Sequence, residues 1–431
     1  MTELPVLRLT RRASASPRLR GGHLWVYRNE LEGPDSEPAA GSLVSVVDAS
    51  ERPIGTGLYS SASLIAVRLV SSAAQLTREQ YLADIRVRVK AALARRRVVA
   101  PLDQDTTAQR LIFSEADNLP GIIVDRYGAM VVLQLLMQGT AQDDVRDAVV
   151  GTLKAQLSAS LQPLTLWERP DPRIRELEQL SAPSTDALFT NQPEPEATTV
   201  FSLNGLSFGY DIGAGQKTGA FLDQRLNYAA AAAHVKASGL HKRALDICTY
   251  HGGFALHLAQ VCDRVTGVDK SHSALEVAEK NLQLNADSLP TANVDWIEAD
   301  AFDLMRALDD AHRNPDEKNK LPLDAREPFD AIVLDPPAFA KTKRAAEGAL
   351  RGYKELNLRA IRLLAPGGTL ITCSCSHHVS LAEFTEVVAA AAADAGRRVQ
   401  LLETRAAAPD HPEVLTLPET QYLKCLILRV E

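Results

Sequence analysis

Two cysteines that close a hydrophobic run are candidates for a nucleophile. Cys373 and Cys375 end the run GGTLITCSC, and Cys375 is nearer the end of the strand that this run predicts. Side chains alternate faces along a strand, so the two thiols share one side if the strand persists through both. Ligands of open α/β sheets bind beyond the carboxyl ends of the strands. We therefore predict Cys375 as nucleophile and Cys373 as structural, although the doubled motif leaves the assignment open between them.

An acid followed by two prolines is a second candidate for chemistry. Asp335, Pro336 and Pro337 close the run FDAIVL. The proline rings fix two φ angles and remove two backbone donors, so they hold the carboxyl group and the following carbonyls in a set geometry. Phe339, two places after the second proline, could stack on a planar ring. This corner is a candidate substrate-binding site.

A glycine pair and three acids at strand ends predict a cofactor site. The stretch ALDICTYHGGFALHLA places Asp246 at the end of a strand and Gly252-Gly253 at the turn into a helix, where missing side chains let a ligand approach the backbone. About 20 residues further, Asp269 ends the next strand, where a carboxylate can accept hydrogen bonds from a ribose diol. Asp300 ends a third strand, from which it could bind an adenine amine. The turn has no GxGxxG sequence, which argues against a nicotinamide dehydrogenase.

The elements that position these residues alternate between strands and helices. After Val200, short hydrophobic runs such as ALDIC, RVTGVD and FDAIVLD are separated by helical stretches of about 10 to 15 residues. This rhythm predicts a doubly wound α/β domain with a parallel sheet. The polar segment at residues 309–328 is expected to be a surface insertion before the central strand.

The N-terminal part of the chain has a different organisation. Residues 5–70 hold short apolar bursts separated by Gly, Pro, Asp and Ser, which predicts a small β-rich unit without a long helix. Helical spacing predicts a helix over about 77–99, and a small α+β unit follows over 111–167. The segment 181–199 has the composition of a loop or linker. We therefore expect domains at residues 1–75, 76–195 and 196–431.

Composition and cysteine usage exclude several classes of protein. The chain has 431 residues, 45% of them hydrophobic, which indicates two or three globular domains and excludes a disordered protein. Apolar stretches stay well below about 18 residues and the first residues lack a signal peptide's apolar region, so we expect a cytoplasmic protein without a membrane partner. Five cysteines without paired CxxC elements predict neither a disulfide framework nor a metal site.

Positive charge is concentrated near the N-terminus. The net charge is −7, yet residues 1–100 hold 15 Lys and Arg against 9 Asp and Glu. The predicted helix at 77–99 carries part of this surplus on the side expected to be exposed, at Arg86, Arg88, Lys90 and Arg95 to Arg97. The surplus is either a solvated face or a surface for an anionic partner.

Several motifs resemble one family of enzymes. The three strand-end acids resemble the class I S-adenosylmethionine-dependent methyltransferases. The segment FGYDIGAGQKTGAFLDQRLNY at residues 208–228 is similar, in GQKTG and LDQR, to the bacterial ribosomal RNA methyltransferases of the RlmI type. That family also carries DPPxF and SCS motifs and, near its end, a motif like HP...PET.YLK, which His411 to Lys424 match here.

The resemblance implies an architecture, a cofactor and a partner. It implies an N-terminal PUA domain, a small β-barrel that docks RNA with its basic surplus, then a central α+β domain and a C-terminal Rossmann-like methyltransferase domain. The implied partner is 23S ribosomal RNA, no metal is expected, and a homodimer is left open. The implied cofactor is S-adenosylmethionine, held by the glycine pair, the three strand-end acids, Lys217, Thr218, Asp223, Arg225 and Asp335.

A thiol in such a methyltransferase has a particular chemical use. Carbon 5 of a pyrimidine is not nucleophilic until a thiolate adds to carbon 6. Catalytic roles for Cys375 and Asp335 therefore imply methylation of carbon 5 of a flipped cytidine in large-subunit RNA, with Pro336, Pro337 and Phe339 binding the base. Two alternatives stay open: methylation of an RNA nitrogen at the DPPxF corner with Cys375 merely packed, and a non-catalytic RNA-binding factor in ribosome biogenesis.

Overall fold

The computed structural model describes residues 3–33, 37–213, 219–314, 323, 327–339 and 346–431. The chain forms two compact units. The first comprises Met1–Phe201, Tyr210–Ala220 and Pro409–Thr420, and the second comprises Ser202–Gly209, Phe221–Ala408 and Gln421–Glu431. Each unit is therefore discontinuous in sequence, and the C-terminal part of the chain contributes to both.

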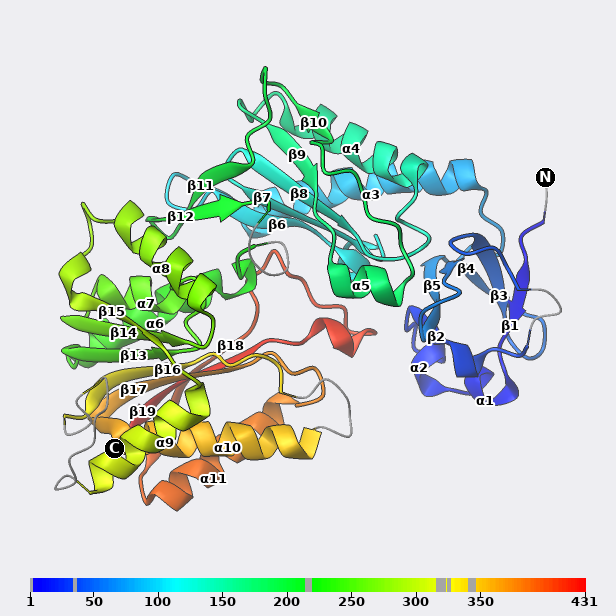
Figure 1. Ribbon diagram of the computed structural model, residues 1–431. Coiled ribbons are helices and arrows are strands. Elements are labelled where there is room, and N and C mark those ends of the chain that lie inside the picture. The colour runs from blue at the N-terminus through cyan, green and yellow to red at the C-terminus, as the bar shows by residue number, and fades with distance from the viewer. Residues whose placement is uncertain (1–2, 34–36, 214–218, 315–322, 324–326, 340–345) are drawn as a thin grey trace. The chain divides into compact units, whose positions relative to one another are not determined.

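The N-terminal part of the first unit is β-rich, as the sequence predicts (Figure 1). Its strands are β1 (Val6–Arg8), β2 (Trp25–Tyr27), β3 (Leu43–Val47), β4 (Pro53–Tyr59) and β5 (Ile65–Ser71). They form one sheet in the order β1-β3-β4-β5-β2, in which only β1 and β3 run parallel. The helices between β1 and β2 are single turns, α1 (Arg11–Ser14) and α2 (Pro17–Arg20).

A second sheet in the same unit follows helix α3 (Arg78–Val99), which confirms the helix predicted over 77–99. Its strands are β6 (Ala108–Phe113), β7 (Ile122–Tyr127), β8 (Met130–Leu135), β9 (Thr165–Glu168) and β10 (Phe189–Thr190), in the order β10-β9-β8-β7-β6. Helix α4 (Asp143–Leu157) packs against α3, and both share a hydrophobic core with the sheet. The short helix α5 (Pro172–Leu177) follows β9.

The prediction of a linker over residues 181–199 is wrong in part. Strand β10 lies inside this segment and pairs antiparallel with β9. Phe189 is partly buried against the hydrophobic core of the second sheet, which holds the edge strand in place despite the Pro- and Ser-rich composition around it. Strand β11 (Thr198–Leu203) also begins within the segment and pairs with β12 (Leu206–Asp211).

The basic side of α3 is only partly exposed, contrary to the prediction. Arg96 is fully buried and its guanidinium contacts both carboxylate oxygens of Asp117, at 2.6 and 2.7 Å. Arg95 pairs with the same carboxylate, and Arg88 donates to two backbone carbonyls. These arginines stabilise the first unit, whereas the exposed basic residues of the helix are Arg86, Lys90 and Arg97.

The second unit is built on a seven-stranded sheet. Its strands are β13 (Arg243–Ile247), β14 (Arg264–Asp269), β15 (Val294–Glu298), β16 (Phe329–Leu334), β17 (Leu364–Ser374), β18 (Val399–Arg405) and β19 (Lys424–Val430). The order is β15-β14-β13-β16-β17-β19-β18, and all neighbours run parallel except β19, which is antiparallel to both β17 and β18. The prediction of a parallel sheet is therefore wrong for β19, the last strand along the chain.

Helices cover both faces of this sheet (Figure 1). One face carries α6 (Arg225–Ser238), α7 (Gly253–Ala259) and α8 (His272–Leu284), and the other carries α9 (Ala301–Arg313), α10 (Ala346–Leu363) and α11 (Leu381–Ala395). The helices before β15 cover one face and the helices after it cover the other. The chain returns from the edge strand β15 to the middle of the sheet, where β16 pairs with β13. This arrangement confirms the predicted doubly wound, Rossmann-like domain.

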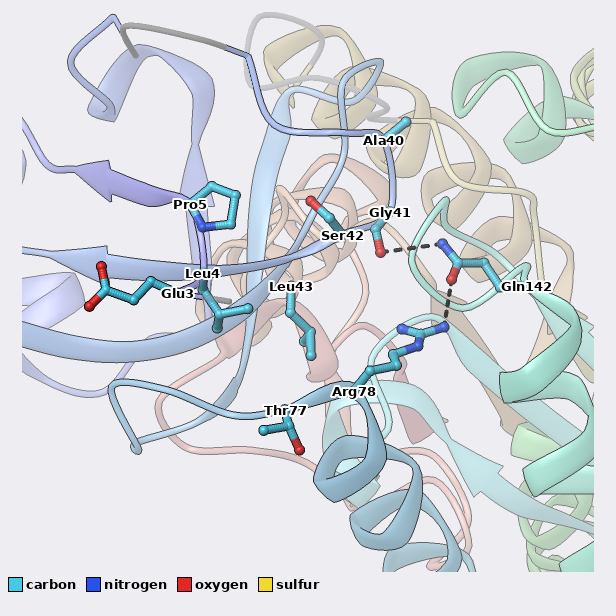
Figure 2. A pocket seen from close by; sticks show the side chains of 10 residues that line it. All are labelled: Glu3, Leu4, Pro5, Ala40, Gly41, Ser42, Leu43, Thr77, Arg78 and Gln142. Atoms are coloured by element: carbon cyan, nitrogen blue, oxygen red, sulfur yellow. Dashed lines mark hydrogen bonds between the residues drawn. The ribbon is translucent and has the colours of Figure 1, made fainter. Parts of the chain in front are cut away.

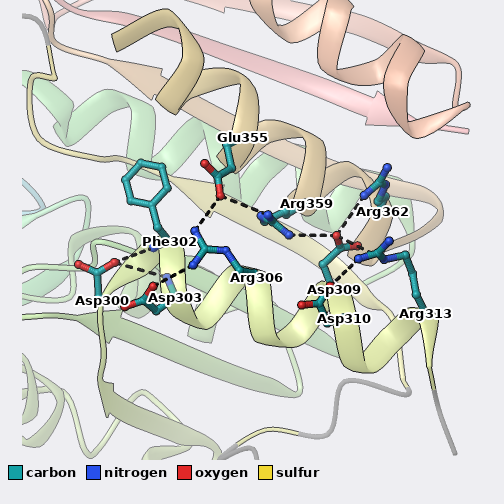
Figure 3. A network of polar contacts seen from close by, with 10 residues as sticks. All are labelled: Asp300, Phe302, Asp303, Arg306, Asp309, Asp310, Arg313, Glu355, Arg359 and Arg362. Carbon is teal, nitrogen blue, oxygen red and sulfur yellow. Dashed lines mark hydrogen bonds and ion pairs between the residues drawn. The ribbon is translucent and has the colours of Figure 1, made fainter. Parts of the chain in front are cut away.

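The predicted surface insertion at 309–328 begins inside a helix. Helix α9 continues to Arg313, and Asp309 within it is fully buried. One carboxylate oxygen of Asp309 lies 3.1 Å from both Arg359 and Arg362 on α10 and 3.7 Å from Arg313 (Figure 3). Asp309, the first residue of the segment, is therefore a buried member of an ion cluster that joins α9 to α10. Residues 315–322 and 324–326 lie outside the described residues.

Candidate functional site

Asp246 lies in the central strand β13, close to its carboxyl end, and is fully buried. Its Oδ2 accepts hydrogen bonds from the hydroxyl of Thr249 at 2.6 Å and from the backbone N–H of Ala255 at 2.9 Å. Its Oδ1 has no hydrogen-bond partner among the described residues. Burial raises the pKa of Asp246 to about 7. A buried carboxyl with one unused oxygen is suited to a ligand that brings its own donor.

Asp246→Asn is expected to change how stability depends on pH. A carboxyl whose pKa is raised on folding stabilises the protein fully below its ordinary pKa of 3.8 and loses this contribution as the pH rises through about 7. Asparagine does not ionise. Between pH 5 and pH 8 the free energy of unfolding of the parent should therefore fall relative to the variant, by of the order of 2 kcal/mol. Urea unfolding at both pH values measures the difference, and a constant difference would contradict the raised pKa.

The turn after β13 requires glycine at two positions. Gly252 has φ +83°, a left-handed conformation that glycine adopts without strain. Gly253 begins α7, and a Cβ there would lie 2.5 Å from the ring of Tyr228. The sequence predicts that the glycines admit a ligand, whereas at Gly253 the space is taken by this tyrosine ring.

The other two strand-end acids belong to the neighbouring strands. Asp269 closes β14, and its two oxygens accept hydrogen bonds from the backbone N–H groups of Ser271 at 2.9 Å and Tyr250 at 3.0 Å. Asp300 follows β15 and caps the first turn of α9, with Nζ of Lys270 at 3.2 Å from its Oδ2. Because β13, β14 and β15 are parallel neighbours, the three predicted acids stand along one edge of the sheet.

The LDQR segment before α6 reaches the Asp-Pro-Pro corner. Nε2 of Gln224 donates to Oδ1 of Asp335 at 3.0 Å, and Oε1 of Gln224 accepts from the amide of Asn227 at 2.6 Å. Gln224 is buried, so its amide holds the carboxyl of Asp335 in one place. Asp223 accepts a hydrogen bond from the hydroxyl of Tyr422.

The other residues of this motif that were predicted to hold the cofactor are Arg225, Lys217 and Thr218. Arg225 is buried, and its Nη1 donates to the backbone carbonyl of Leu222 at 3.1 Å. Its position at the start of α6 indicates a role in packing this turn. Lys217 and Thr218 lie outside the described residues.

The two candidate thiols have different surroundings. Strand β17 ends at Ser374, so it does not persist through both cysteines. Cys373 lies within the strand, directly opposite Cys425 of β19, and burial raises its pKa well above the ordinary value. Cys375 lies just beyond the strand, is half-buried, and its Sγ is 3.8 Å from the carbonyl oxygen of Pro336. The structure therefore places Cys375 against the carbonyl of Pro336, whereas Cys373 lies inside the strand, close to Gln224 and Asp335.

A tyrosine of α10 holds both serines that flank Cys375. The hydroxyl of Tyr353 lies 3.0 Å from Oγ of Ser374 and 2.9 Å from Oγ of Ser376. Tyr353 is buried, and burial raises its pKa. The ring of Phe339 packs against the ring of Tyr353, with centroids 4.8 Å apart. The aromatic residue predicted to stack on a base is thus itself supported by the core and only half-buried.

Sequence reasoning missed two positioning residues at this corner. Gln224 belongs to the LDQR motif, so the motif itself was the available signal. Tyr353 stands inside a helix outside any motif, and only the fold shows that it meets the serines around the thiol.

A cavity of about 590 Å³ lies in the first unit, and none of the predicted site residues lines it. In it, Oε1 of Gln142 accepts a hydrogen bond from Arg78 at 2.5 Å, and Nε2 of Gln142 donates to the carbonyl of Gly41 at 3.3 Å (Figure 2). The side chain of Gln142 is therefore held by hydrogen bonds to its neighbours within the cavity wall.

Metal-binding groups, membrane-spanning helices and disulfides were sought in the described part of the chain. Within it, no group of three or more His, Cys, Asp or Glu side chains could hold a metal ion. None of the described helices has the length and apolar character needed to cross a membrane. The five cysteines are free thiols.

Two families of known protein domains match parts of this chain. Residues 7–72 match the PUA-like domain, and residues 181–429 match the S-adenosylmethionine-dependent methyltransferases. Two similar proteins are named ribosomal RNA large subunit methyltransferase I. The one from Citrobacter koseri is 34% identical and the one from Shewanella denitrificans 37% identical, each over 95% of this chain and 95% of the relative.

Solved structures show the same fold. The protein SMU.776, crystallised with SAH, is 19% identical, covers 100% of both chains and has a TM-score of 0.76. A SAM-dependent methyltransferase from Streptococcus mutans is also 19% identical, covers 98% of this chain and 99% of its own, and has a TM-score of 0.75. At this identity the likeness concerns the fold alone.

Proposed function

This chain belongs to the family of S-adenosylmethionine-dependent methyltransferases that includes ribosomal RNA large subunit methyltransferase I, and we propose that it methylates carbon 5 of a cytidine in 23S ribosomal RNA through a covalent adduct with Cys375. One observation carries the proposal. The sulfur of Cys375 lies just beyond a central strand and 3.8 Å from the carbonyl of Pro336, the residue that follows Asp335.

The residues at the sheet edge fit S-adenosylmethionine. Three carboxyl groups end adjacent strands, and the buried Oδ1 of Asp246 has no hydrogen-bond partner among the described residues. Acceptors in such a row suit a ligand with a ribose diol and amino groups. In the proposal, Asp269 binds the ribose and Asp300 binds the adenine amine. Asp246 supports the turn through Gly252 and Gly253 and offers its unused Oδ1 to a donor of the cofactor.

The chain's own residues activate the base. The thiolate of Cys375 forms a bond to carbon 6 of the cytosine ring. The electron pair of the double bond between carbons 5 and 6 then forms a double bond between carbons 4 and 5, and nitrogen 3 takes up a proton, which leaves an enamine that is nucleophilic at carbon 5. Asp335, held by Gln224, binds the ring at nitrogen 3 or the exocyclic amine and favours this addition. When bound, S-adenosylmethionine supplies a methyl group on a positively charged sulfur, and carbon 5 accepts it.

The adduct must then be released. Loss of the carbon 5 proton to a base and cleavage of the sulfur–carbon 6 bond restore the aromatic ring and the cysteine. A base stacked in a helix cannot expose carbon 6 to a thiol, so the proposed substrate is an unpaired or flipped cytidine. Pro336, Pro337 and Phe339 would hold that base at the corner.

Identification of the product tests the proposal. The protein is incubated with unmodified ribosomal RNA and methyl-labelled S-adenosylmethionine, and the RNA is digested to nucleosides for mass spectrometry. Labelled 5-methylcytidine in 23S RNA is the expected result. A labelled N-methyl nucleoside would overturn the carbon 5 chemistry in favour of the DPPxF corner alone, and an absence of label from all RNA would favour a non-catalytic RNA-binding factor.

The exposed arginines of α1 are expected to contact RNA phosphates. Replacing both Arg11 and Arg12 with alanine should weaken rRNA binding and lower the slope of log affinity against log salt concentration by about 1.5, because each phosphate contact contributes ~0.7–0.9. Filter binding over a range of salt concentrations measures this slope. Arg52→Ala is the matched control, since Arg52 is exposed but already paired with Asp48 at 2.8 Å. Equal slopes for both variants would refute the contact.

A further inference from the structure

A buried lysine stands on the strand next to the candidate nucleophile. Lys424 begins β19 and pairs across the sheet with Ser374, the last residue of β17. It is only 5% exposed. Its Nζ donates to the carbonyl oxygens of Ser376 at 2.7 Å and Tyr422 at 2.9 Å. The ammonium group is thus fixed against the residue that follows Cys375.

Two groups that can carry negative charge are close enough to interact electrostatically with this ammonium. One is the thiol of Cys375, just beyond β17, and the other is the carboxylate of Glu383 in the first turn of α11. Burial lowers the pKa of Lys424 to about 8, while the negative forms of both groups raise it. Lys424 therefore remains largely protonated at pH 7. Glu383 is exposed and accepts hydrogen bonds from Ser380, so it caps α11 as well.

A fixed cation beside a thiol has a known physical effect. It stabilises the thiolate, which is the form that attacks, more than the thiol. The effect is larger for a buried cation because solvent screens it less. The hydrogen bonds from the ammonium of Lys424 to backbone carbonyls add a second effect, since they hold the turn that carries Cys375 in one conformation.

We propose that Lys424 is a positioning residue for the nucleophile, whose ammonium fixes the turn at Ser376 and favours the thiolate of Cys375. This inference rests on the proposed function, in which Cys375 attacks the base. It assigns a role to the lysine of the C-terminal PET.YLK motif. Arg429 lies on the same strand but is exposed, and has no part in the proposal.

The pH dependence of thiol alkylation tests the charge effect without RNA. Full-length protein is treated with iodoacetamide over a range of pH, and the rate at Cys375 is followed by peptide mass spectrometry. In Lys424→Met the rate at pH 7 should fall by about tenfold and the midpoint should move up by ~1 pH unit, whereas Lys424→Arg should stay within about threefold of the parent. Arg429→Met is the matched control and should leave the profile unchanged.

A second variant keeps the test decisive if Lys424→Met does not fold, which S-adenosylmethionine binding by calorimetry would reveal. Glu383→Gln retains the cap of α11 but removes the negative charge that competes for Lys424. Its alkylation rate at pH 7 should rise by about twofold. If Lys424→Met folds and its alkylation profile coincides with that of the parent, the inference is overturned. If Lys424→Met is unfolded, a Glu383→Gln profile that coincides with that of the parent overturns it instead.

The outcomes separate this inference from the proposed function. A shifted alkylation profile together with labelled 5-methylcytidine supports both. A shifted profile with only N-methyl nucleosides supports the charge effect of Lys424 but overturns its role in attack on a base. Labelled 5-methylcytidine with an unshifted profile leaves the proposed function standing and overturns the role of Lys424.

Discussion

Cys375→Ala is expected to lower the rate of methyl transfer to RNA by roughly 10⁴-fold, the size of loss that follows removal of a catalytic nucleophile. Without the thiol no bond to carbon 6 can form, so carbon 5 stays unreactive. The loss should appear in single-turnover rates with labelled S-adenosylmethionine. Cofactor affinity should change little, because Cys375 lies at the Asp-Pro-Pro corner and not among the three strand-end acids.

Cys373→Ala is the matched control. Cys373 lies inside β17, faces Cys425 and is fully buried, and burial disfavours its thiolate. Its replacement should cost some stability but leave the single-turnover rate within about tenfold of the parent. Activity that survives Cys375→Ala and is lost in Cys373→Ala would assign the nucleophile to the other thiol. Activity that survives in both variants would exclude covalent catalysis by this strand.

A substrate analogue gives independent support for the adduct. RNA that carries 5-fluorocytidine has no proton at carbon 5 to lose, so the sulfur–carbon bond cannot be released after methyl transfer. The parent protein should therefore form a complex with this RNA that survives denaturing electrophoresis. Cys375→Ala should form none, while Cys373→Ala should behave like the parent.

The strand ends of the second unit were predictable because hydrophobic runs are local features. The runs that end near Asp246, Asp269 and Asp335 predict strands that stop there, and β13, β14 and β16 do so. The direction of β19 was not predictable, since the run KCLILRV reads as a strand in either direction. The sequence also left open where β17 ends, because Cys375 and Ser376 continue the pattern of small residues that precedes them.

Partners of the site residues could not be predicted, since they are far apart in sequence. Gln224 and Asp335 are separated by 111 positions, and Lys424 and Ser376 by 48. Only the topology of the sheet brings such pairs together.

The buried charge of Asp309 was missed for a different reason. Asp309 stands in a polar segment, and composition alone does not show that Arg359 and Arg362 compensate it inside the domain.

Asp335→Asn is expected to lower the single-turnover rate by about 10²–10³-fold. Asparagine has the same shape, and its carbonyl oxygen can still accept the hydrogen bond that Gln224 donates at 3.0 Å, so the corner should keep its geometry. What it lacks is a proton that can pass to nitrogen 3, where negative charge develops as the thiolate adds to carbon 6. Calorimetry with S-adenosylmethionine and filter binding with RNA should show little change, which would place the loss in the chemical step.

The same variant separates the two roles assigned to Asp335. A loss confined to S-adenosylmethionine affinity, with normal rates at saturating cofactor, would make Asp335 a cofactor ligand and remove it from catalysis. Gln224→Ala is the companion variant, because it removes the donor that fixes the carboxyl group but leaves the carboxyl group itself. Its rate should fall by about tenfold, less than in Asp335→Asn, since a free carboxylate still reaches the ring in part of the population. A larger loss in Gln224→Ala than in Asp335→Asn would mean that the amide, and not the carboxylate, contacts the base.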